Sequence, residues 1–104
     1  MMPPVKTKNE LLNRILSHKS EIQDFGVKKL GLFGSFVRDE ANSESDVDLL
    51  VELPPERKRL KNFMGLIYYL EDLTGRRVEM LTPQGLSPYI GPHILKTVEN
   101  VFTE

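Results

Sequence analysis

Two aspartates separated by one residue are the side chains that first point to chemistry. Asp46 and Asp48 stand at the start of a short apolar stretch that is typical of a β-strand. Because side chains alternate along a strand, both carboxylates should leave the same face, where their like charges repel. A cation between them removes that repulsion, and Mg²⁺ is a hard ion that prefers oxygen ligands. The pair therefore predicts a Mg²⁺ site, and the alternative is a solvated sheet face.

A glycine and a serine form the second candidate, after an apolar stretch that ends at Phe33. Gly34 would let a phosphate approach the backbone, and the first amides of a following helix would face the anion. Ser35 can add a hydrogen bond from its hydroxyl, and Arg38 can reach the same phosphates with its forked donor. The alternatives are a plain turn with an N-cap serine and an arginine that faces solvent. The segment is thus a candidate cradle for the phosphates of a nucleotide.

A third acidic residue interrupts another apolar stretch. Glu79 stands within the run from Val78 to Leu81, so the strand predicted there would carry one charge among apolar side chains. If this strand lies beside the one with Asp46 and Asp48, Glu79 could complete the metal site or act as a base toward an attacking hydroxyl. The alternative is an exposed charge on an edge strand. Glu79 is therefore the third candidate site residue.

These candidates need a framework of helices and strands. Apolar residues at helical spacing after a Thr7–Glu10 capping box predict a first helix that ends before Gly26. Apolar stretches bounded by turn residues predict strands over 27–33, 46–53 and 76–82. Further helices are predicted over 36–41, over 57–73 and through Ile94, Leu95, Val98 and Val101, with loops over 42–45 and 84–92. This order indicates an α/β or α+β domain whose small sheet is flanked by helices.

Two of these elements should have distinct faces. One face of the strand over 46–53 should carry Val47, Leu49 and Val51, and the other Asp46, Asp48, Leu50 and Glu52. The core-facing stripe of the helix over 57–73 should consist of Leu60, Phe63, Met64, Ile67 and Leu70. The strand should therefore be anchored in the core by its apolar face and should present the two carboxylates on a rigid support.

Composition limits the class of protein. The chain has 104 residues, which fit one domain over 1–104, and its 39% hydrophobic and 28% charged residues disfavour disorder. No apolar run approaches the roughly 20 residues that a membrane helix needs, and the N-terminal residues lack the apolar region of an export signal. We therefore expect a cytoplasmic protein without membrane contact.

Cysteine content and charge narrow the possible ligands. The sequence has no cysteine and two histidines, which excludes thiolate metal sites and leaves oxygen or imidazole ligands. The formal net charge is -1 and the pI is near 6.1, so the chain lacks the basic excess of proteins that neutralise a phosphate backbone. We therefore do not expect direct binding to long nucleic acid.

The candidate residues match a known family. Gly34-Ser35, followed by Asp46 and Asp48 and a carboxylate on a later strand, resembles the signature of the DNA polymerase β nucleotidyltransferase superfamily. Three stretches within residues 27–101 are similar to the minimal nucleotidyltransferase (MNT) subgroup, the antitoxin partners of HEPN-domain toxins. These stretches are GLFGSFVRDEANSESDVDLLVEL, LEDLTGRRVEMLTP and ILKTVENV.

The resemblance implies a fold, a reaction and a partner. The implied fold is polymerase β-like, a small mixed β-sheet flanked by helices, with two Mg²⁺ ions at Asp46, Asp48 and Glu79 and a triphosphate at Gly34 and Ser35. The implied reaction transfers AMP from ATP, with release of pyrophosphate, to a tyrosine hydroxyl of the cognate HEPN ribonuclease toxin in a type VII-like toxin–antitoxin pair. Glu79 departs from the subgroup's pattern, because the third carboxylate there is often an aspartate.

Other functions stay open at this point. The chain could neutralise its toxin by binding alone, with the fold kept as a scaffold, or it could transfer a nucleotide to a small molecule or to RNA. A chain of this length without a basic excess has little room for a deep acceptor pocket, which favours an acceptor presented by another protein. Adjacent carboxylates are costly without a cation, and this favours an active enzyme over a binding protein.

Overall fold

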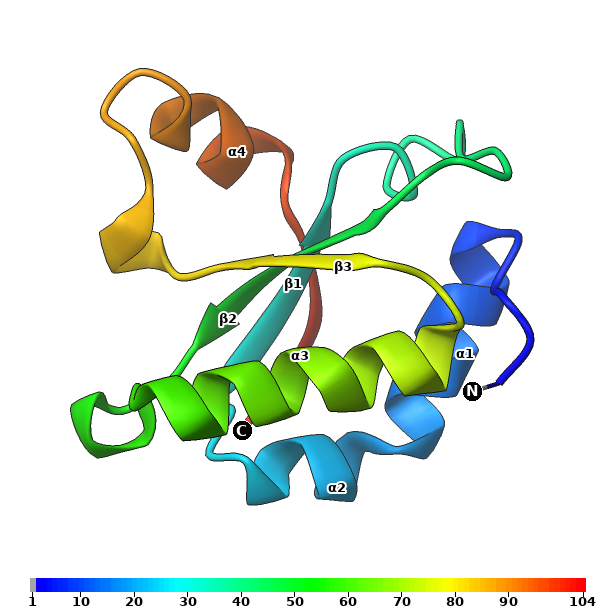
Figure 1. Cartoon of the computed structure of the whole chain (residues 1–104). Coiled ribbons are helices and arrows are strands. Elements are labelled where there is room, and N and C mark those ends of the chain that lie inside the picture. The colour runs from blue at the N-terminus through cyan, green and yellow to red at the C-terminus, as the bar shows by residue number, and fades with distance from the viewer. Residues whose placement is uncertain (1) are drawn as a thin grey trace.

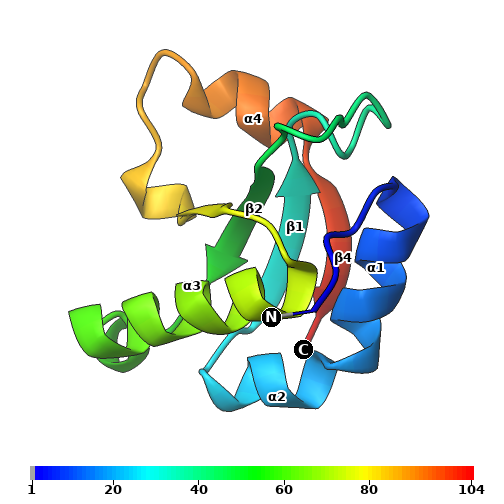
Figure 2. The ribbon, with the colours of Figure 1, turned by 45° about the vertical axis from the view of Figure 1, so that its right-hand side comes forward.

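Helices cover both faces of a four-stranded sheet in the computed structural model of the protein, which describes residues 2–104. Helices α1 (Lys8–Ser17), α2 (Lys19–Asp24) and α3 (Leu60–Thr74) pack against one face, and α4 (Gly91–Thr97) packs against the other. Figures 1 and 2 show α4 apart from the other three helices. Within residues 2–104, none of the helices combines the length and the apolarity that crossing a bilayer requires. The α/β architecture expected from the sequence is confirmed.

The sheet is mixed, with the strand order β3-β2-β1-β4. Its strands are β1 (Lys29–Phe33), β2 (Val47–Glu52), β3 (Val78–Leu81) and β4 (Glu99–Thr103). β1 runs antiparallel to both β2 and β4, whereas β2 and β3 are parallel and are connected through α3. The mixed sheet implied by the resemblance is therefore present, and its parallel pair holds two of the predicted acidic residues side by side.

The main core lies between the sheet and helices α1 to α3. Val47, Leu49 and Val51 of β2 are all fully buried in it, as the alternation along the strand predicts. On the opposite face of the sheet, Leu50 packs with Phe33 and Ile94 in a smaller apolar cluster. Because Asp48 and Leu50 lie two residues apart on one strand, the Asp48 carboxylate belongs to the face on which α4 lies.

The first helix begins as predicted but ends early. The Thr7 Oγ1 accepts a hydrogen bond from the backbone N–H of Glu10 at 3.1 Å, which is one half of the predicted capping box. The helix then stops at Ser17, whose hydroxyl donates to a carbonyl one turn earlier, and the ring of His18 contacts another such carbonyl. These side-chain bonds compete with helical continuation. The single helix predicted up to residue 25 is therefore wrong, and two helices occupy the segment.

The helix predicted over 36–41 is also wrong, because residues 35–39 form a turn. Asp39 has a φ of 56°, in the left-handed region that a helix of L-residues cannot continue through. The N–H of Glu40 returns to the carbonyl of Ser35 at 2.9 Å, which closes the turn. The polar loop predicted over 42–45 follows it.

The predicted C-terminal helix is a helix followed by a strand. α4 ends at Thr97, Val98 is extended with a ψ of 135°, and Val101 lies in β4 instead of on the helix. Phe102 of β4 is buried and stands opposite Leu30 of β1. Pairing with a strand far away in the sequence therefore outweighs the helical spacing that predicted a longer helix.

The long helix α3 begins later than predicted. Pro55–Arg57 forms a separate 3₁₀ turn, and Leu60, the first residue of α3, is 75% exposed and so lies outside the core-facing stripe. Leu70 is fully buried as predicted, and Phe63 and Ile67 pack partly buried against the core. Leu66, which the predicted stripe did not include, is fully buried as well. The helix ends at Thr74, and Gly75, which has a φ of 68°, caps it.

Candidate active site

Two predicted acidic residues stand side by side on the parallel strands. In the register of β2 and β3, Asp48 is the direct partner of Glu79, and across the antiparallel side Asp48 is the partner of Phe33 at the end of β1. Glu79 is close enough to Asp48 to raise its pKa, both through a hydrogen bond and through its charge. Because the strands are parallel and in register, their side chains at these positions leave the same face. The structure therefore brings Glu79 to Asp48, as the sequence predicts.

The environment of Asp48 favours its protonated form. Burial is the main cause, and the hydrogen bond and the negative charge of Glu79 add to it, so that the pKa of Asp48 rises from 3.8 to about 7. The charge of Asp46 also raises this pKa, whereas the guanidinium of Arg38 lowers it. Four of the predicted site residues thus interact electrostatically at one place. A cation in place of this proton would offset the negative charge that burial and the neighbouring carboxylates disfavour.

The predicted glycine turn touches the same carboxylate. Gly34 has a φ of 78°, which L side chains rarely adopt, and it follows directly on β1. A Cβ placed on Gly34 would overlap Oδ2 of Asp48 and would lie 2.9 Å from its Cγ. The position therefore requires glycine both for its backbone conformation and for the space that the aspartate occupies.

The rest of the predicted cradle differs from the expectation. Since Ser35 opens a turn and not a helix, the proposed contribution of helix N-terminal amides to phosphate binding is wrong. The Ser35 hydroxyl and the backbone around Gly34 remain as the donors of this segment. Arg38 is exposed, and its Nε lies 3.3 Å from Oε1 of Glu40 in an ion pair. An exposed arginine in this place can exchange that partner for a phosphate.

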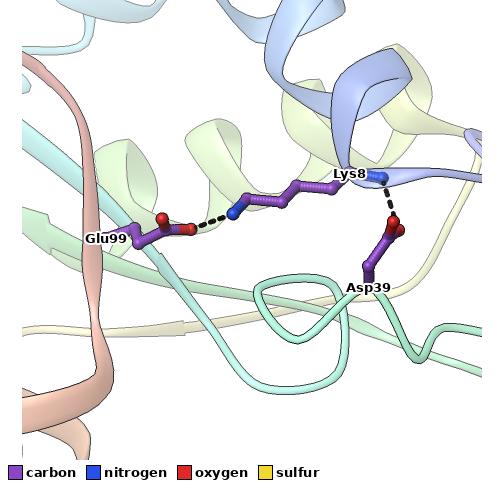
Figure 3. Close-up of polar contacts among 3 residues, drawn as sticks. All are labelled: Lys8, Asp39 and Glu99. Carbon is purple, nitrogen blue, oxygen red and sulfur yellow. Dashed lines mark hydrogen bonds and ion pairs between the residues drawn. The ribbon is translucent and has the colours of Figure 1, made fainter.

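The segment between Gly34 and Asp46 is tied to α1 at its middle. Figure 3 shows Lys8 between two acidic residues: its backbone N–H donates to Oδ1 of Asp39 at 3.4 Å, and its Nζ forms an ion pair with Glu99 of β4. Asp39 is the residue with the left-handed backbone conformation. Lys8, at the start of α1, is therefore linked both to the turn and to the edge strand β4.

A second basic residue, which the sequence did not point out, holds the later part of this segment. The guanidinium of Arg76 donates to the carbonyls of Asn42 and Ser45 at 2.7 and 3.0 Å and to that of Val5 at 2.8 Å. Arg76 and its neighbour Arg77 look alike in the sequence, and only the tertiary contacts distinguish them. No local pattern could have identified Arg76.

An open groove lies beside the acidic residues. It has a volume of about 780 Å³, in the range of small-molecule sites. Asp46 stands on its wall, while Asp48, Glu79 and Gly34 do not. The residues lining it are Pro4, Lys6, Ala41, Asn42, Ser43, Glu44, Ser45, Asp46, Gly75, Arg76 and Arg77. The groove therefore adjoins the carboxylates from the side of Asp46.

The donor set fits a magnesium ion in its chemistry. Within residues 2–104, no three acidic or histidine side chains are already arranged as a complete metal site. Mg²⁺ does not require such a cage, because it keeps several waters and is bound by one or two carboxylates together with substrate phosphates. The paired carboxyls of Asp48 and Glu79, with Asp46 close enough to raise the pKa of Asp48, are ligands of that kind.

Sequence comparison places the chain among nucleotide-transferring proteins. The nucleotidyltransferase domain family matches residues 10–100. Protein adenylyltransferase MntA of Thermococcus cleftensis is 40% identical over 93 residues, which are 88% of this chain and 93% of that relative.

Comparison with solved structures gives the same fold. A structure provisionally described as a minimal nucleotidyltransferase has a TM-score of 0.78 and 31% identity, covering 89% of this chain and 94% of the other. The complex of a tri-AMPylated Shewanella oneidensis HEPN toxin with an MNT antitoxin matches with a TM-score of 0.60 and 14% identity, covering 94% of this chain and 74% of the matched one. This second likeness is one of fold alone.

Proposed function

Because the chain belongs to the nucleotidyltransferase domain family and has a protein adenylyltransferase as its relative, we propose that it transfers AMP from ATP to a tyrosine hydroxyl of a HEPN ribonuclease toxin. In this proposal it is the cytoplasmic antitoxin of a type VII-like pair, and residues 1–104 act as one nucleotidyltransferase domain. The similar fold of an MNT antitoxin bound to a tri-AMPylated HEPN toxin supports the choice of partner. The observation that carries the proposal is the carboxyl pair of Asp48 and Glu79 against Gly34.

The proposed roles follow from the donor types. Asp46, Asp48 and Glu79 would hold Mg²⁺, with Glu79 either as the third ligand or as the base. When bound, Mg²⁺ supplies positive charge that offsets the negative charge on the transferred phosphoryl group and on the departing pyrophosphate. The triphosphate would be held by the backbone of Gly34, the hydroxyl of Ser35 and the guanidinium of Arg38.

The proposed reaction is an in-line displacement at the α-phosphorus. The tyrosine oxygen forms a bond to this phosphorus while the bond to the bridging oxygen of the β-phosphate breaks, and pyrophosphate leaves. The phenolic proton goes to Glu79 or to solvent. Asp48 would have to be ionised to hold a cation, and with a pKa of about 7 it can lose its proton near neutral pH. The open groove beside Asp46 leaves room for an acceptor presented by another protein.

Incubation of the purified chain with ATP, Mg²⁺ and its cognate toxin tests the proposal. Mass spectrometry should detect the addition of AMP to a tyrosine of the toxin. The double variant Asp46→Asn/Asp48→Asn should give no adduct, while Glu52→Gln, which alters an exposed carboxylate at the far end of β2, should react as the wild type does. Absence of an adduct with the wild-type chain at saturating ATP would overturn the proposal.

Survival of cells that express the toxin separates catalysis from binding. The double aspartate variant should fail to neutralise the toxin. If that variant protects cells as well as the wild type does, the chain acts by binding alone, and the catalytic part of the proposal is wrong.

A further inference from the structure

We propose that Arg76 is a positioning residue. It holds the segment before Asp46 so that the carboxylate of Asp46 faces the site formed by Asp48 and Glu79. This inference rests on the proposed function. Arg76 precedes β3, the strand of Glu79, and it reaches across to the segment between β1 and β2. A single guanidinium therefore connects the parts of the chain that carry the candidate residues.

The need for such a residue follows from where β2 begins. β2 starts at Val47, so Asp46 lies just outside the strand, after a loop whose residues are largely exposed. Strand pairing alone orders Asp48 but not the peptide that precedes Asp46. A loop peptide without such support is free to rotate, and the direction of its side chain changes with it.

The hydrogen bonds of Arg76 act directly on that peptide. Its Nη1 donates to the carbonyl of Ser45, which belongs to the same peptide unit as the nitrogen of Asp46, at 3.0 Å. On the other side of Asp46, the N–H of Val47 donates to the backbone carbonyl of Arg77 at 2.9 Å. Asp46 is thus held before and after by two consecutive residues of the segment that leads into β3.

The same guanidinium reaches the glycine turn and the N-terminal segment. It lies over the ring of Phe36, 5.2 Å from the ring centre, and Phe36 is fully buried directly after Ser35. Its Nε donates to the carbonyl of Val5 at 2.8 Å. A planar guanidinium with several fixed donors can stack on the ring and donate to these carbonyls at the same time. A lysine ammonium cannot do both.

Arg14 provides a matched comparison within the same molecule. Its Nη1 donates to the carbonyl of Leu73 at 3.2 Å and to that of Pro3, so it too joins the N-terminal segment to the end of α3. Within residues 2–104, Arg14 makes no hydrogen bond to the segment from Asn42 to Asp46. Loss of Arg14 therefore reports the general cost of loosening the N-terminal segment, without an effect on Asp46.

Titration calorimetry with Mg²⁺-ATP, without the toxin, tests the inference on the wild-type chain and on Arg76→Ala, Arg76→Lys and Arg14→Ala. Loss of an outer partner of a metal ligand typically weakens metal binding by about 10- to 100-fold, and we expect a weakening of this size for Arg76→Ala. Arg76→Lys should weaken binding less, and Arg14→Ala should bind as the wild type does. Thermal unfolding of the metal-free chains should show similar losses for Arg76→Ala and Arg14→Ala.

Each outcome has a defined meaning. Wild-type affinity in both Arg76 variants, or an equal loss of affinity in Arg14→Ala, would overturn the inference. If Arg76→Ala does not fold, Arg76→Lys decides in the same way, because it keeps the charge and loses the fork. If the wild-type chain itself does not bind Mg²⁺-ATP, the proposed function is wrong, and this inference, which rests on it, is wrong as well.

Discussion

Asp48 leaves no room for a side chain at Gly34: its carboxylate, on the strand antiparallel to β1, occupies the volume in which a side chain at position 34 would begin. We therefore expect Gly34→Ala to weaken Mg²⁺-ATP binding, because the methyl group displaces the carboxylate. The positive φ should also cost about 1–2 kcal/mol in the free energy of unfolding. Calorimetry and urea unfolding measure the two effects separately.

Gly65 offers the control for this substitution. It lies inside α3, and a Cβ there would make an ordinary contact, 3.5 Å from Cε1 of Phe25. Gly65→Ala should stabilise the chain by about 0.5–1 kcal/mol, as alanine does in helix interiors, and leave nucleotide binding unchanged. Equal losses of binding in the two variants would contradict the special role of Gly34.

Removal of the Asp48 charge should stabilise the metal-free chain in a pH-dependent way. Below about pH 3, the carboxyl is largely protonated in both the folded and the unfolded chain, so it favours neither. As the pH rises toward 7, the unfolded chain loses this proton first, because the folded pKa is raised from 3.8 to about 7, and the wild type loses stability. Asp48→Asn avoids this loss, so its advantage in urea unfolding should grow from about pH 3 to about pH 7 and then level off.

Addition of Mg²⁺ should make the wild type more stable than Asp48→Asn. At pH 8 the cation should raise the melting temperature of the wild type and leave that of Asp48→Asn nearly unchanged, since a ligand stabilises only the state that binds it. A stability difference that is independent of pH would show that Asp48 keeps an ordinary pKa.

Substitution of Glu79 should change the titration of its neighbour. In Glu79→Gln the negative charge that raises the pKa of Asp48 is absent, so this pKa should fall below about 7, and burial should keep it above 3.8. Carboxyl ¹³C NMR of the metal-free chain measures the value directly. The adduct assay should show a loss of about 10²- to 10⁴-fold in rate if Glu79 is the base. Glu79→Asp keeps the charge, so it should retain more of that rate, and equal rates in the two variants would contradict a role for the charge.

The ion pair between Lys8 and Glu99 should contribute little to stability. Its side chains are 27% and 52% exposed, and pairs of this kind are worth less than about 1 kcal/mol. Lys8→Gln should therefore lower the free energy of unfolding by less than that amount, in 0.1 M salt, as measured in urea. The bond from the backbone of Lys8 to Asp39 stays intact in this variant, so Mg²⁺-ATP binding should not change. A larger loss would indicate that the lysine holds the turn through its side chain as well.

The sequence could predict the parts that depend on local alternation and residue type. Val47, Leu49 and Val51 alternate with Asp48 and Leu50, and this period of two identifies β2 and its faces without tertiary information. The placing of Asp48 beside Glu79 followed from the resemblance and from one assumption, that their strands are neighbours, and the register bears this out.

The parts that could not be predicted depend on contacts between distant residues. Val98 and Val101 fit helical spacing, yet β4 pairs with the edge of β1, where Phe102 stands opposite Leu30, and no local pattern reveals this pairing. Asp39 looks like any helix residue until its backbone is known to be left-handed. Arg76 stands beside another arginine in the sequence, and its three carbonyl partners come from two other segments.

The parallel pairing of β2 and β3 has a consequence for insertions and deletions. No tight turn sets the offset between these strands, because α3 lies between them and packs its buried residues against the sheet. One residue added between Gly75 and Val78 would turn Glu79 to the opposite side of the sheet, since neighbouring strand positions face opposite ways. The loop from Pro54 to Arg59 lies ahead of the packed part of α3, so it can absorb a change in length that the other end of the helix cannot.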